Sequence, residues 1–131
     1  MTDLTVAHPV VDWGIDLLAF QPDPLTVAGV QVKGASSGFS VLQQYATQKV
    51  IIAHVLDPLG SEPTVCLFSG TEAWSLPGEY VRRGGKASCR EPDYGGKYRW
   101  SKVTRLLQTM LLEHQATPEL WATMFQHATS K

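Results

Sequence analysis

The segment VIIAHVLDPLGSEPTVCLF (Val50–Phe68) carries the pattern that decides the fold. Its first part, Val50–Leu56, is apolar on both faces, which is typical of a strand in the middle of a sheet. Asp57–Gly60 is a turn sequence with proline at its favoured second position, and Thr64–Phe68 then forms another apolar strand. The segment therefore predicts two strands joined as a hairpin, the first of them central.

Two more strands and a short helix are predicted on the N-terminal side of this hairpin. Pro9–Leu17 ends in an alternation of apolar and polar residues, which is the period of a half-buried strand. The two prolines of Gln21–Pro24 end this strand, and Leu25–Lys33 resumes as a strand rich in β-branched residues. After a Gly/Ser loop, Ser40 is a suitable N-cap for a short helix. The expected order up to this hairpin is therefore β-β-α-β-β.

The C-terminal part predicts a pair of helices over residues 101–128. Ser101 is a suitable N-cap for the first helix, whose apolar residues recur on one face. Thr117 and Pro118 begin the second, as N-cap and first helical residue. We expect a single α+β domain over residues 1–131: a small, mainly antiparallel sheet in the β-β-α-β-β order, with the two C-terminal helices packed on one face.

Composition indicates an ordinary globular chain without a membrane segment. Of the 131 residues, 44% are hydrophobic and 18% charged, and every uninterrupted apolar run is far shorter than a bilayer-spanning helix requires. The first residues lack a signal-peptide pattern, so we expect a cytoplasmic protein. Cys66 and Cys89 are far apart and form no CxxC motif, so neither a disulfide framework nor a zinc site is predicted. We expect no metal and no cofactor.

The net charge of −1 conceals a strong segregation of charge along the chain. Residues 82–105 contain eight basic and two acidic residues, a net charge of +6. Residues 1–81 contain two basic and eight acidic residues, a net charge of −6, and residues 106–131 carry −1. Such asymmetry is informative about binding partners, because a basic patch attracts anionic surfaces.

The basic window overlaps a segment rich in glycine and aromatic residues, YVRRGGKASCREPDYGGKYRW (Tyr80–Trp100). Its many helix and strand breakers predict an irregular loop or hairpin over residues 80–100. Arginine and lysine donate to phosphate or carboxylate oxygens, and tyrosine rings can stack on unpaired bases. The predicted anion-binding residues are Arg82, Arg83, Lys86, Arg90, Lys97, Arg99, Lys102 and Arg105, with Tyr94 and Tyr98 as stacking groups.

The start of the first C-terminal helix adds a second argument for an anionic partner. Lys102 and Arg105 lie in its predicted first turns, where the helix dipole favours acidic residues. Cations around a helix N-terminus suit a bound anion. The alternative is that these residues only solvate a loop, and that Trp100 packs beneath the helix as a core residue.

The leading functional prediction is a non-enzymatic binding or adaptor module that contacts nucleic acid through this basic segment. An acidic protein surface is the alternative partner, because it would satisfy the same charges. The C-terminal apolar stripe either completes the domain core or forms a homodimer. The stripe consists of Leu120, Trp121, Met124 and Phe125.

A further alternative comes from a short stretch near the N-terminus. Pro22-Asp23, then the strand ending Gln31-Val32-Lys33, a helix and an apolar strand, resembles the core of the PD-(D/E)xK nucleases. The resemblance implies that Asp23 would hold a divalent metal and that Lys33 would assist the attacking water. Gln31 stands where that family has a metal-binding acid.

His54, within the apolar strand, is predicted to be a hydrogen-bonded core residue.

Overall fold

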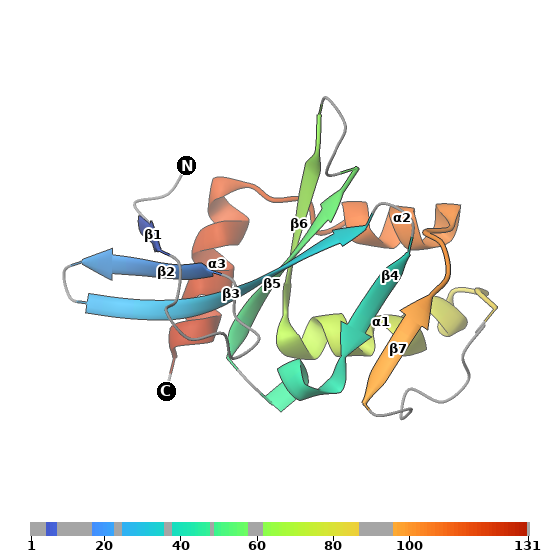
Figure 1. The fold of residues 1–131 in the computed structure, drawn as a ribbon, viewed down its shortest axis with the longest axis horizontal. Helices are drawn as coiled ribbons and strands as arrows, with labels where there is room; N and C mark the ends of the chain where they lie inside the picture. The colour runs from blue at the N-terminus through green and yellow to red at the C-terminus, as the bar shows by residue number, and fades with distance from the viewer. Residues whose placement is uncertain are drawn as a thin grey trace.

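The computed structural model confirms the α+β class (Figure 1). The structure describes residues 5–7, 17–22, 25–35, 38–47, 49–57, 62–86 and 96–130. Within these residues, none of the helices has the length and apolar character needed to span a membrane.

The main sheet has five strands in the order β1-β2-β3-β5-β6. The strands are β1 (Thr5–Ala7), β2 (Leu17–Pro22), β3 (Leu25–Ala35), β5 (Val50–Leu56) and β6 (Thr64–Ser69). Only β3 and β5 run parallel; the other neighbouring pairs are antiparallel. The prediction for the segment Val50–Phe68 is therefore confirmed, because β5 lies between β3 and its hairpin partner β6.

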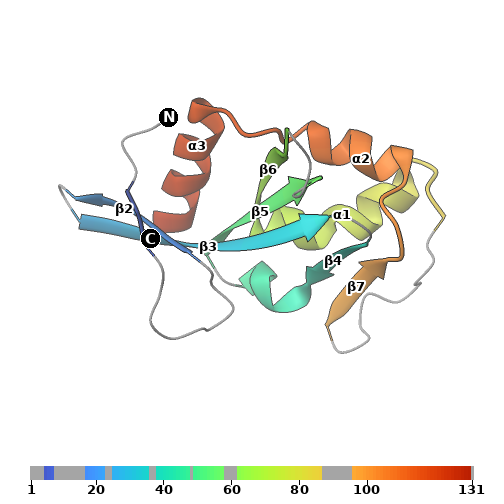
Figure 2. The ribbon, with the colours of Figure 1, turned by 45° about the horizontal axis from the view of Figure 1, so that its top comes forward.

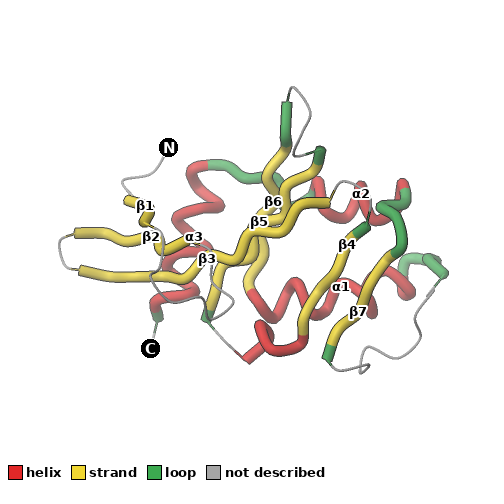
Figure 3. Tube along the Cα trace, in the orientation of Figure 1, coloured by secondary structure: helices red, strands yellow, loops and turns green. Residues whose placement is uncertain are grey.

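A second sheet of two strands differs from the expected layout. It consists of β4 (Phe39–Leu42) paired antiparallel with β7 (Lys97–Trp100), seen side by side in Figure 3. The helix predicted to begin at Ser40 is therefore wrong, and only a 3-10 turn, η1 (Gln43–Thr47), follows β4. Buried and half-buried residues alternate along β4, and its hydrogen-bond partner lies more than fifty residues away, beyond any local signal.

Helix α1 (Gly70–Arg82) leads into the basic segment and was not among the predicted elements. Ser69 caps its first turn, accepting from the Glu72 amide at 3.1 Å while the Glu72 carboxylate accepts from the Ser69 amide at 2.9 Å. This reciprocal pair is a capping box, which satisfies two otherwise unpaired amides. Pro77 lies inside the helix, where proline is normally a breaker, and for this reason the sequence pattern did not indicate a helix.

The first glycine pair of the basic segment ends α1. The Gly85 amide donates to the Tyr80 carbonyl at 2.9 Å and the Gly84 amide donates to the Val81 carbonyl at 3.0 Å. Gly84 has φ of +94°, so this is a Schellman C-cap that favours glycine at that position. The segment predicted as a loop or hairpin thus begins as a helix end and finishes as β7, and residues 87–95 lie outside the described part.

The C-terminal helices are α2 (Arg105–Leu112) and α3 (Pro118–Thr129). The start of α3 is as predicted, with Thr117 as N-cap accepting from the Leu120 amide at 3.0 Å. The start of α2 is not: its N-cap is Thr104, which accepts from the Leu107 amide at 3.2 Å, rather than Ser101. The preceding residues continue β7 up to Trp100, which pairs with Phe39 of β4, so the helix begins later.

The two helices pack on opposite faces of the sheet, not on one face as expected. Alternate side chains of β6 point to the two faces of the sheet. On one face, Cys66 and Phe68 pack in a cluster with α1, α2 and the small sheet; on the other, Leu67 packs in a cluster with α3. The link between the helices runs along the edge of β6, where the Leu67 amide donates to His114 and the Ala116 amide donates to Val65 (Figure 2). The chain crosses from one face to the other at this edge.

The apolar stripe of α3 lies within the domain core. Met124 and Phe125 are buried against the sheet, and Leu120 and Trp121 pack around them half-buried. A homodimer through this helix stays a prediction, since these contacts are internal to the chain.

Candidate functional site

The structure divides the predicted anion-binding residues into two groups. Arg82 and Arg83 lie at the C-terminal end of α1, whereas the remaining described cations lie beyond it. These remaining residues are Lys86, Lys97, Arg99, Lys102 and Arg105. The predicted contacts Arg90 and Tyr94 fall outside the described residues.

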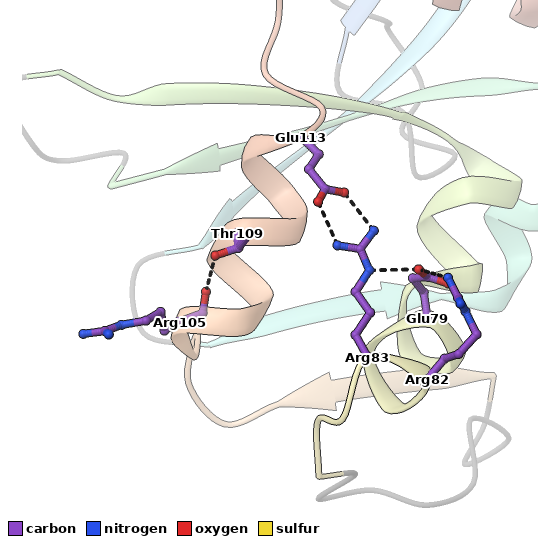
Figure 4. A network of polar contacts seen from close by, with 6 residues as sticks. All are labelled: Glu79, Arg82, Arg83, Arg105, Thr109 and Glu113. Atoms are coloured by element: carbon purple, nitrogen blue, oxygen red, sulfur yellow. Dashed lines mark hydrogen bonds and ion pairs between the residues drawn. The ribbon is translucent and has the colours of Figure 1, made fainter.

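Arg82 and Arg83 form an ion-pair network with two glutamates (Figure 4). Arg83 donates to both carboxylate oxygens of Glu113, with Nη1–Oε2 and Nη2–Oε1 distances of 2.7 and 2.9 Å. Its Nε also donates to Glu79 at 2.9 Å. Arg82 donates to the same carboxylate, from Nε at 2.8 Å and from Nη2 at 2.5 Å.

This network connects the C-terminal end of α1 to the C-terminal end of α2. Its two positive charges are balanced by two negative charges. Hydrogen bonds from Arg82 and then Arg83 lower the pKa of Glu79 to about 2. The hydrogen bond from Arg83 likewise lowers the pKa of Glu113. Two guanidinium groups thus face two ionised carboxylates, and the fork-to-fork geometry of Arg83 is the strong form of such pairing. These arginines contribute little net positive charge to the surface.

The cations of β7 have a different environment. Lys97 and Arg99 are exposed and alternate with the buried Tyr98 and Trp100, so both basic side chains share the outer face of the small sheet. Arg99 Nη1 lies 3.4 Å from the Ser40 hydroxyl on the neighbouring strand, which is a long contact for a hydrogen bond.

Lys102 and Arg105 continue this basic surface around the start of α2. Both are exposed, Lys102 in the connection after β7 and Arg105 as the first helical residue. Figure 4 shows the Arg105 side chain pointing away from the α1–α2 network. Lys86, just after the end of α1, is exposed as well. Among the described residues, the ion pairs with carboxylates involve only the arginines of the α1–α2 network.

The described aromatic residues of the basic segment belong to the core rather than to the surface. Tyr98 and Trp100 are each 2% exposed, with ring centroids 4.7 Å apart, and Tyr80 is 5% exposed. The Tyr80 hydroxyl forms a hydrogen bond of 2.8 Å with the Thr104 hydroxyl, so it contacts the start of α2. The ring of Tyr98 therefore faces the core and not a base in solution.

A groove of about 260 Å³ lies beside the ion-pair network, between α1 and α2. Its polar walls include Glu79, Glu113, Arg83 and His114. The His114 ring stacks on Phe68 with centroids 4.2 Å apart, and its Nδ1 is 3.2 Å from the Leu67 carbonyl oxygen. Sequence reasoning missed this groove because α1 was not expected, and its carboxylates make it unsuitable for an anion.

The residues that carry the nuclease resemblance lie partly inside the fold. Gln31 is 6% exposed and accepts from the Tyr45 hydroxyl at 3.1 Å. Lys33 is half-buried on the same face of β3, opposite His54 of β5. Asp23 lies outside the described residues. No group of three or more His, Cys, Asp or Glu side chains within the described ranges is arranged to hold a metal ion.

No protein-family model matches the chain, and neither a curated protein nor a solved structure matches it.

Proposed function

We propose that the chain is a non-enzymatic nucleic-acid-binding module that contacts phosphates through β7 and the start of α2. One observation carries the proposal: residues 96–112 contain four basic residues and no acidic one, and all four cations are exposed. Arginine and lysine in this setting offer donors and charge to phosphate oxygens, and release of counterions from the nucleic acid then favours binding.

The burial of Tyr98 and Trp100 favours a duplex over a single strand. Proteins that bind unpaired bases stack them on exposed aromatic rings. The described part of the basic surface offers cations, whereas Tyr98 and Trp100 are in the core. Phosphate contacts alone position a protein on a duplex without reading its sequence. We therefore expect binding with little sequence preference.

Duplex binding is tested by removing the two cations of β7. The variant Lys97→Gln/Arg99→Gln is compared with Lys49→Gln/Arg82→Gln, because both lose two positive charges. In the control, Lys49 donates to the Ser130 carbonyl and Arg82 donates to the Glu79 carboxylate, and neither residue belongs to β7 or to the start of α2. Fluorescence anisotropy with a labelled duplex should show a weaker complex and a salt slope reduced by up to about 2 for the β7 variant only.

Equal losses in the two variants would refute a site on β7 and indicate an effect of total charge. If the partner is an acidic protein, the wild type should not bind the oligonucleotide. It should instead bind an acidic polypeptide such as polyglutamate, and the same β7 substitutions should release that polypeptide. The proposed compartment is the cytoplasm, with which the free thiol of Cys66 is compatible.

A metal-dependent nuclease is the second proposal, favoured by the shared face of Gln31 and Lys33 on β3. Under this proposal, cleavage of DNA would require a divalent metal and would be lost in Lys33→Ala. Lys49→Ala is the control, since that lysine lies outside the motif. Cleavage that survives Lys33→Ala would exclude this motif as the source of the activity.

A further inference from the structure

The guanidinium group of Arg99 lies directly over the backbone of Gly38, the residue before β4. A Cβ atom at residue 38 would be 2.6 Å from the Arg99 Nη2 and 3.1 Å from its Cζ. The first distance is too short for two non-bonded heavy atoms. The guanidinium can therefore occupy this position only because residue 38 has no side chain.

The pairing of β4 with β7 explains how this contact forms. Ser40 and Arg99 are directly opposite each other, so Gly38 is a diagonal neighbour of Arg99. A long side chain can reach a diagonal neighbour on the same face of an antiparallel pair. Phe39 and Trp100 are buried in the core. The residues that alternate with them in each strand therefore share the outer face of the small sheet.

The Arg99 guanidinium keeps most of its hydrogen-bond donors available. A guanidinium carries five N–H groups. Within the described residues, the only polar contact of this side chain is the one of 3.4 Å between Nη1 and the Ser40 hydroxyl. Arg83, by contrast, donates from all three of its side-chain nitrogens to Glu79 and Glu113. Arg99 is thus held against the sheet, while its donors are not used by carboxylates of the described part of the chain.

An arginine held in this way is suited to binding an anion. A long exposed side chain loses rotamer freedom when it binds, and holding it in advance removes part of that cost. We propose that Gly38 and Ser40 position the Arg99 guanidinium for a bidentate contact with one phosphate of the duplex. This inference rests on the proposed function, because it concerns the orientation of one of its four cations. Gly38 and Ser40 are positioning residues, which act through Arg99.

NMR relaxation of the arginine side chains tests the positioning without any nucleic acid. In the wild type, the Nε–H group of Arg99 should have a higher order parameter than that of Arg105, which is also exposed. Gly38→Ala should lower the Arg99 value towards that of Arg105, because the added methyl group displaces the guanidinium. An Arg99 order parameter equal in Gly38→Ala and the wild type would overturn the proposal, whether or not the protein binds nucleic acid.

Duplex binding tests the role of Gly38 in the proposed site. Gly38→Ala should weaken the complex several-fold in the wild-type background and have no further effect in a protein that carries Arg99→Gln. Gly78→Ala is the control, because it adds the same methyl group on α1, where the group meets open space. The new methyl group at residue 38 would also lie 3.2 Å from the Trp100 carbonyl oxygen, so urea unfolding should confirm that the variant is folded. Equal weakening in both backgrounds would indicate a merely structural effect and overturn the proposal.

Arg99→Lys tests the same contact without changing the backbone. This variant keeps the positive charge and leaves Gly38 in place. It should nevertheless weaken the complex several-fold, because an ammonium is a point charge and cannot make a bidentate contact. A lysine variant that binds as tightly as the wild type would contradict the proposal. If the wild type does not bind the duplex at low salt, the proposed function fails and the phosphate contact with it, whereas the NMR comparison still decides whether Gly38 positions the guanidinium.

Discussion

The pKa of His54 lies far below the ordinary value of a histidine, because burial and then the charge of Lys33 lower it to about 3. The sequence places this residue in an apolar strand, which suffices to predict that it is buried. The burial is confirmed, but the predicted hydrogen bond is not found among the described residues. The contacts of His54 with Lys33 and Phe39 could not be predicted, because these residues reach it from β3 and β4, which local sequence does not place beside β5. The lowered pKa of His54 is therefore a property of the tertiary structure.

This pKa makes stability depend on pH in a defined window. Above pH 6.5 the ring is neutral in both states; between pH 6.5 and about 3 only the unfolded chain takes up the proton. The free energy of unfolding should therefore fall as the pH falls through this window, by on the order of 5 kcal/mol in total. Urea unfolding should be measured at several pH values for the wild type and for His54→Phe. The free energy of unfolding of the wild type should depend more steeply on pH in this window. The same pH dependence in both proteins would show that other groups cause it.

Helix α1 shows what could have been predicted at the scale of an element. Ser69 and Glu72 have the spacing of a capping box, and Gly84 follows the helix at the position typical of a C-cap. Both signals are local and were obscured by Pro77. By contrast, β4 and β7 depend on pairing with each other across the chain, and no local pattern specifies that.

Two glycines in and just after α1 should respond in opposite ways to substitution by alanine. Gly84→Ala should lower the free energy of unfolding by about 1 kcal/mol or more, because φ of +94° strains any residue with a Cβ. Gly78 lies in the interior of the helix, where an added methyl group would meet open space, so Gly78→Ala should raise it by about 0.5–1 kcal/mol. Thermal or urea unfolding measures both. Stabilisation by Gly84→Ala would contradict the C-cap described here.

At the scale of the whole molecule, the chain separates its charges as the sequence indicated, but not all of them form one surface. The charge count is a sum over residues and could be predicted directly. The pairing of Arg83 with Glu113 could not, because it requires α1 and α2 to lie side by side. The same packing places Tyr98 in the core, so the cations of β7 and α2 remain as the basis of the proposed function.

The salt dependence of duplex binding by the wild-type protein tests the proposed function most directly. If the four cations of residues 96–112 contact phosphates, the logarithm of the binding constant should fall linearly with the logarithm of the salt concentration, with a slope of about −3 to −4. A single strand of the same length should bind no more tightly than the duplex. No measurable binding to the duplex at low salt, or a slope near zero, would contradict the proposed function.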